Sequence, residues 1–154
     1  MRLMKLALVA TLVAAAYGVQ AQADPTVGTW KLNLAKSKYN AGQPPKSSTV
    51  VIAAAGQGIK LTSDTVLADG TARKISYTAS YDGKDAVVTG TPDYDGMSLK
   101  KTANGAEGAR KKAGKVVQTY TRVISADGKT MTVTSAGTTA AGAKVDNVQV
   151  YDKQ

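Results

Sequence analysis

The 154-residue chain contains no cysteine and no histidine. Without cysteine it forms no disulfide bonds, and without either residue type it lacks the usual protein ligands of zinc and copper. The same absences exclude a Ser-His-Asp triad and a Cys-His pair, and nothing in the chain singles out a mechanism based on lysine or aspartate alone. We therefore predict a protein that is not an enzyme and that has no metal site and no cofactor.

Phenylalanine is also absent, and aromatic residues make up only 5% of the chain. The core must therefore combine one tryptophan, several tyrosines and many small side chains. Small inward side chains leave either a cavity or a narrow, flattened barrel, and both alternatives agree with the sequence.

The N-terminus has the three parts of a Sec signal peptide, namely a basic start, an apolar run and small residues before a cleavage point: Arg2 and Lys5, residues 6–19, and Ala21 with Ala23. The run is shorter than the roughly 20 residues that a membrane-spanning helix needs. We predict a signal peptide over residues 1–23, cleaved after Ala23. The mature domain would cover residues 24–154 in the periplasm or outside the cell.

Turn signals then recur at hairpin spacing, most of them Asp-Gly or Asn-Gly: Asp69-Gly70, Asp82-Gly83, Asp95-Gly96, Asn104-Gly105, Ala113-Gly114, Asp127-Gly128 and Ala141-Gly142. Between them apolar and polar residues alternate with a period of two, which is typical of strands with one buried face. We predict an all-β domain, a single antiparallel up-and-down barrel of about eight to ten strands. The irregular residues 35–46 are expected to form a loop that either folds over the barrel mouth or is simply solvated.

Gly28-Thr29-Trp30 on the first strand resembles the lipocalin-like (calycin) barrels. The C-terminal third resembles the intracellular fatty-acid-binding proteins at four places, which are Thr121-Arg122, Asp127-Gly128, residues 130–134 and Val150-Tyr151-Asp152-Lys153. As a whole, the chain is similar to bacterial exported proteins of the lipocalin-like type.

In the fatty-acid-binding family two arginines and a tyrosine hold the ligand carboxylate. The resemblance places one arginine at Arg122 and the tyrosine at Tyr151, but the second arginine falls on Gln149. Glutamine donates hydrogen bonds without supplying a charge or a bidentate fork. The paired helices that follow the first strand in this family are missing, because residues 35–46 are short and rich in glycine and proline.

The hairpin around Asp127-Gly128 bears independently on the arginine. A two-residue turn there pairs Ile124 with Met131 and, further along, Arg122 with Val133. Directly opposed residues share one face of the sheet. Because the apolar pair marks the core, the arginine is predicted to face inward as well.

Tyr120 shares this inner face with Arg122. An interior arginine is costly unless it is paired, so two interpretations stay open: it packs against Trp30 and closes the barrel end, or it anchors an anion in a cavity. Trp30 is interpreted as a core plug, with ligand stacking as the alternative. The candidate ligand contacts are Arg122, Tyr151, Gln149, Tyr120 and Trp30.

Arg110 cannot be placed in the same way. A turn at Asn104-Gly105 puts it opposite Leu99 and facing inward, whereas a turn at Ala113-Gly114 puts Val117 beside it, in the opposite phase to Arg122. Both turns are compatible only if a β-bulge lies between them. Arg110 therefore stays unassigned.

Our leading hypothesis is an exported monomer that binds a small hydrophobic or amphipathic ligand non-covalently inside the barrel. The alternative is an outer face that binds an anionic envelope component or a protein, since the chain carries a net charge of +9 and its basic residues gather at Lys100-Lys101, residues 110–112 and Lys115. A solubilising surface that also protects the sheet edges is the preferred explanation of these residues. No nucleic-acid partner is expected, because no aromatic residues interleave the basic cluster.

Overall fold

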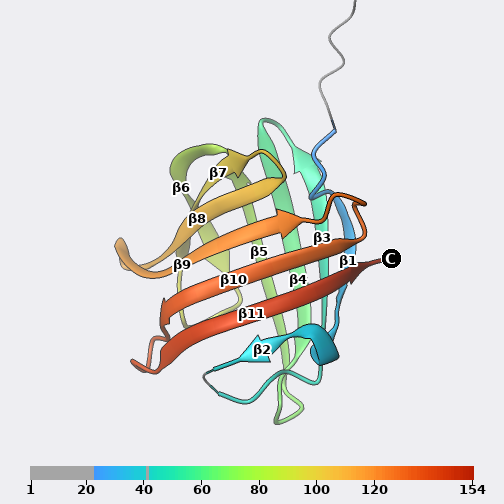
Figure 1. Cartoon of the computed structure of the whole chain (residues 1–154). Coiled ribbons are helices and arrows are strands. Elements are labelled where there is room, and N and C mark those ends of the chain that lie inside the picture. Colours follow the sequence, from blue (N-terminus) through green and yellow to red (C-terminus); the bar gives the residue numbers. More distant parts are fainter. Residues whose placement is uncertain (1–22, 41) are drawn as a thin grey trace, which may run out of the picture.

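A closed antiparallel sheet dominates the computed structural model, which describes residues 23–40 and 42–154 (Figure 1). Its strands are β1 (Gly28–Leu32), β2 (Lys38–Tyr39), β3 (Ser47–Ala55), β4 (Gly58–Val66), β5 (Ala72–Ser80), β6 (Asp82–Thr89), β7 (Gly96–Thr102), β8 (Gly105–Lys112), β9 (Lys115–Ile124), β10 (Thr130–Thr138) and β11 (Lys144–Lys153). A single 3-10 turn, η1 (Leu34–Lys36), is the helical structure found in this part of the chain. The signal peptide predicted over residues 1–23 lies almost entirely outside the described residues and stays a prediction.

Strand β1 closes the barrel because it pairs on both of its edges. Trp30 is opposite Val50 of β3 on one side and opposite Lys153 of β11 on the other. From β3 to β11 each strand pairs with the next along the chain, and the two-residue strand β2 extends the free edge of β11. Ten strands therefore form the wall, and the predicted all-β, up-and-down barrel is confirmed.

The β9–β10 hairpin shows how local sequence sets the register. Gly128 adopts a positive φ of 70°, which glycine tolerates without strain, and its N–H donates to the Ser125 carbonyl at 2.8 Å. Ile124 then lies opposite Met131. The predicted register of this hairpin, and with it the inward direction of the arginine on β9, is confirmed.

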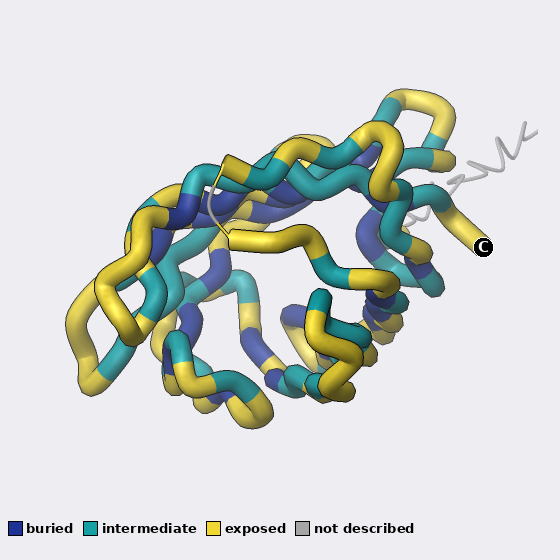
Figure 2. Tube along the Cα trace, turned by 90° about the horizontal axis from the view of Figure 1, so that it is seen from below, coloured by how far each residue is buried: buried dark blue, intermediate teal, exposed yellow. Residues whose placement is uncertain are grey.

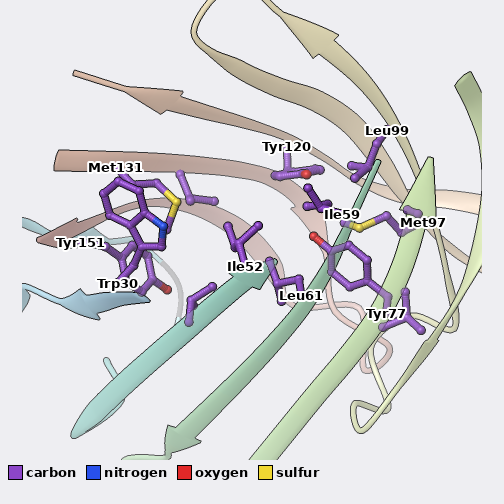
Figure 3. Packing of buried hydrophobic residues seen from close by; sticks show 14 of the residues in the cluster. Trp30, Ile52, Ile59, Leu61, Tyr77, Met97, Leu99, Tyr120, Met131 and Tyr151 are labelled. Carbon is purple, nitrogen blue, oxygen red and sulfur yellow. The ribbon is translucent and has the colours of Figure 1, made fainter. Parts of the chain in front are cut away.

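One end of the barrel is closed by apolar packing (Figure 3). Its inward side chains are at most 2% exposed: Trp30, Ile52, Ile59, Leu99, Ile124 and Met131. The indole Nε1 of Trp30 donates to the Thr26 carbonyl at 2.9 Å, and the Lys153 ammonium lies 5.2 Å from the ring centroid. The cation that covers the tryptophan is therefore Lys153. The alternative in which Arg122 packs there is wrong, because its guanidinium lies beside Tyr120 instead.

The opposite end is open between the β4–β5, β6–β7 and β10–β11 connections, which are residues 67–71, 90–95 and 139–143. Figure 2 views this end, where the exposed segment that follows residue 41 crosses the ring of strands. Gly42, Gln43 and Pro45 of that segment line the interior cavity. Of the two alternatives for this loop, the structure shows the one that folds over the mouth. No helix in the described part of the chain is long and apolar enough to cross a membrane.

Candidate ligand-binding cavity

A cavity of about 350 Å³ occupies the half of the barrel nearer the mouth. This volume lies in the range of about 300–1,000 Å³ that is typical of small-molecule sites. The wall is apolar on part of its surface, through Val50, Leu61, Ile75, Met97 and Val133, and elsewhere it carries arginine, tyrosine, amide and hydroxyl groups. A molecule that fits this wall needs both apolar and polar parts.

Arg122 on β9 is the most deeply buried charged group of the cavity, with 3% of its surface exposed. Its Nη2 donates to the Tyr77 hydroxyl on β5 at 3.0 Å, while its buried Nε and Nη1 have no hydrogen-bond partner. The ion pairs found among the described residues do not include this arginine. Burial opposes the charge, but the oxygens of Tyr77 and Tyr120 outweigh that effect and keep the pKa of Arg122 above its usual value. The side chain therefore presents a permanent cation with unused donors.

Arg110 reaches the same cavity from the neighbouring strand β8. Its Nη1 donates to Gln118 Oε1 at 2.8 Å and to Ser135 Oγ at 3.1 Å, whereas its buried Nε has no partner. It also takes part in none of the ion pairs of the described residues. A third arginine of the lining, Arg73, lies 3.8 Å from the Asp93 carboxylate, but Arg110 and Arg122 have no such partner among the described residues. These two unbalanced guanidinium groups favour an anionic ligand.

A β-bulge explains why both arginines point inward. Arg110 is opposite Gln118, but the next pair joins Lys111 to Val116, so Val117 is the extra residue of β9. The predicted conflict between the two hairpins is resolved in this way. The predicted pairing of Arg110 with Leu99 is wrong, because the β7–β8 turn lies at residues 103–104, one position earlier than expected, and places Met97 opposite the arginine. A register shift of two residues leaves the inward direction unchanged.

Tyrosine rings hold the two guanidinium groups in place. The ring of Tyr120 lies 5.2 Å from the Arg110 guanidinium carbon and 5.7 Å from that of Arg122, and Tyr94 lies 5.0 Å from Arg110. The Tyr120 hydroxyl is buried without a hydrogen-bond partner. Burial raises the pKa of Tyr120, so that its O–H remains a donor at neutral pH.

Four of the five candidate ligand contacts line this cavity: Arg122, Tyr120, Tyr151 and Gln149. Burial raises the pKa of Tyr151 to about 12, and the side-chain amide of Gln149 donates to the Tyr39 hydroxyl at 3.0 Å. Trp30 does not line the cavity and is fully buried at the closed end. Besides Arg122, the cavity arginine that has no ion pair among the described residues is Arg110 of β8, and position 149 supplies none.

Arg110 could not be placed from the sequence. Its two hydrogen-bond acceptors, Gln118 and Ser135, were not among the predicted site residues. A signal for these two was available, because Gln118, Tyr120 and Arg122 occupy alternate positions of β9, and Ser135 lies opposite Tyr120. The inner face of this hairpin is thus polar for several residues toward the mouth.

The basic cluster of the outer face is smaller than its sequence suggests. Arg110 belongs to the interior, and the Lys111 ammonium lies 2.7 Å from an Asp85 carboxylate oxygen. The ammonium of Lys112 lies 3.5 Å from Asp95. These neighbouring carboxylates offset part of the positive charge on which an outer anion-binding face would depend.

No protein-family model matches the chain, and no curated protein matches it. The closed up-and-down barrel with an interior cavity is the lipocalin-like class of fold. A crystal structure of the zebrafish ileal bile acid-binding protein complexed with cholic acid superimposes with a TM-score of 0.50, covering 84% of this chain and 99% of that chain at 12% identity. This likeness shows the fold and confirms the predicted similarity to the barrel of fatty-acid-binding proteins.

Proposed function

We propose that this protein is an exported carrier that binds a small amphipathic anion non-covalently inside its barrel. The observation that carries the proposal is the buried Arg122, whose Nε and Nη1 have no partner in a cavity with an apolar wall. A buried cation with unused donors is costly until an anion occupies it. The zebrafish neighbour, solved with cholic acid, supports the proposal at the level of a shared fold.

The ligand is expected to enter with its anionic group first. Arg122 lies opposite Val133 of β10. The next inward residue of that strand is the apolar Met131, which belongs to the closed end. The apolar residues Leu61 and Ile75 on the β4–β5 side of the wall accommodate the apolar body of the ligand. Export and a monomeric state belong to the proposal and rest on the sequence.

Calorimetric titration with dodecanoate and with the uncharged dodecanol tests this function. We expect Arg122→Met to weaken dodecanoate binding by about 10- to 100-fold, the range for hydrogen bonds to a charged group. Dodecanol should bind equally to both proteins. Lys74→Met is the matched control, because it removes one positive charge from an exposed side chain of β5. Unchanged dodecanoate binding in Arg122→Met, or no binding to the unmodified protein, would refute the proposal.

A further inference from the structure

Three hydroxyl groups form a cluster on the β3–β4 side of the cavity. Ser48 Oγ lies 2.8 Å from Thr65 Oγ1 and 3.4 Å from Ser63 Oγ, and the two β4 hydroxyls are 3.2 Å apart. All three residues line the cavity, and Ser48 is only 4% exposed. We call Ser48, Ser63 and Thr65 the hydroxyl cluster.

The cluster interrupts an apolar pattern. The inner face of β4 runs from Ile59 at the closed end, through Leu61 in the cavity wall, to Ser63 and Thr65 toward the mouth. On β3 the same face changes from apolar residues to Ser48, which lies directly opposite Thr65. Polar groups at inward positions lower stability unless they are hydrogen-bonded. The mutual contacts offset this cost, but they do not explain why three hydroxyl groups gather on one side of the cavity.

Hydrogen-bond capacity distinguishes this cluster from the arginine side of the cavity. Each hydroxyl has one proton to donate and two lone pairs to accept with. The three contacts within the cluster can use all three of its protons, so that acceptor positions remain toward the cavity. Guanidinium groups only donate. The cavity thus offers donors from Arg110 and Arg122 on β8 and β9, and acceptors from the hydroxyl cluster on β3 and β4.

We propose that the ligand is an amphipathic acid that also carries a hydroxyl group remote from its anionic group. This inference rests on the proposed function. The anionic group binds Arg122 and Arg110, and the hydroxyl group donates to the hydroxyl cluster. An ammonium group is excluded as the second polar group, because three neutral hydroxyls do not offset the burial of a charge. The Asp93 carboxylate, which also lines the cavity, already accepts from the Ala140 N–H and lies 3.8 Å from Arg73.

Paired ligands of equal length test the inference. We would titrate hexanoate, octanoate, decanoate and dodecanoate by calorimetry, each against its ω-hydroxy derivative. At the length that spans the two polar groups, the hydroxy acid is expected to bind about three- to tenfold more tightly, as one additional net hydrogen bond allows. At other lengths the hydroxyl group should weaken binding, because it is buried without a partner.

The variant S48A/S63A/T65V should remove this preference, while the plain acids should bind at least as tightly, because the wall becomes more apolar. Thr62→Val is the matched control, because residue 62 alternates with the inward residues 61 and 63 and so faces outward. If the triple variant does not fold, Ser48→Ala alone should reduce the preference.

Two negative results are distinguishable. If the plain acids bind in an Arg122-dependent manner and no hydroxy acid is preferred at any length, the hydroxyl-bearing ligand is refuted and the proposed function stands. If neither series binds the unmodified protein, the proposed function fails, and this inference fails with it.

Discussion

The closed end of the barrel and its cavity half use the same strands for opposite purposes. At the closed end Trp30, Ile59 and Leu99 are completely buried members of one hydrophobic cluster, and the indole N–H is the one polar group among these three side chains. Gln118 lies only three alternate positions from Ile124 on β9, with Arg110 of β8 opposite it, yet there the inward groups are charged or amide-bearing. The closed end, where packing is dense, contributes most of the stability. The cavity half contains the unused hydrogen-bond donors that can bind a ligand, and such groups usually lower stability.

Trp30→Ala should produce the largest effect. We expect the free energy of unfolding to fall by about 3–5 kcal/mol, because a completely buried aromatic side chain is replaced by a methyl group. Arg122→Met, on the cavity side, should leave this free energy unchanged or raise it, because an unbalanced buried charge is removed. Urea unfolding followed by far-UV circular dichroism measures both. A larger loss for Arg122→Met than for Trp30→Ala would contradict the division between the two halves.

Gly137→Ala should have an intermediate effect, because the added methyl group would distort the β-bulge that directs Arg110 inward. Gly137 has a φ of 142°, and a Cβ atom built there would lie 2.1 Å from the Val117 carbonyl oxygen. We expect a loss of about 1–3 kcal/mol in the free energy of unfolding together with weaker dodecanoate binding. Gly96→Ala is the control, because its Cβ would lie 3.7 Å from that of Lys111. Equal behaviour of the two variants would show that the bulge does not depend on Gly137.

Asp24→Asn should have the smallest effect, and the effect should depend on pH. Burial disfavours the charged carboxylate, but hydrogen bonds from Tyr81 at 2.6 Å and from Thr26 outweigh it and lower the pKa of Asp24 below its ordinary value of 3.8. A depressed carboxyl pKa stabilises the fold above the ordinary value, and this contribution is lost as the pH falls through the folded-state pKa.

The asparagine variant should therefore be less stable at neutral pH, by less than about 1 kcal/mol because the carboxylate is partly solvated. Its stability should also fall less steeply in acid than that of the unmodified protein. Urea unfolding measured at a series of pH values gives both quantities. Tyr81→Phe removes the donor and should reproduce the flatter profile, while an unchanged acid slope in both variants would show that this carboxylate is not linked to folding.

The sequence predicted those parts of the fold that are determined by residues close to each other along the chain. The turn at Asp127-Gly128 and the alternation on both sides of it were enough to direct Arg122 inward. Arg110 needed more, because the bulge at Val117 lies against Gly137 of β10, the strand on the other edge of β9. No pattern within β8 contains that information.

Contacts across the barrel also could not be predicted. The hydrogen bond from Arg122 to Tyr77 joins strands that are not neighbours in the sheet, and the seclusion of Trp30 depends on the pairing of β1 with β11. Both follow from closure of the sheet, which alternation alone does not specify. The resemblance to fatty-acid-binding proteins directed attention to Gln149 as the second polar anchor, whereas the second cavity guanidinium without an ion pair among the described residues comes from β8.

The seclusion of the single tryptophan has an optical consequence. Trp30 is fully buried beneath Thr26 and Lys153, whereas Tyr77, Tyr94, Tyr120 and Tyr151 surround the cavity. Indole emission will therefore follow the opening of the closed end during unfolding and should respond less than the tyrosines to a molecule in the cavity. Tyrosine absorption and emission will respond to occupancy. The protein thus carries two kinds of aromatic reporter at different places, one for its integrity and one for its cargo.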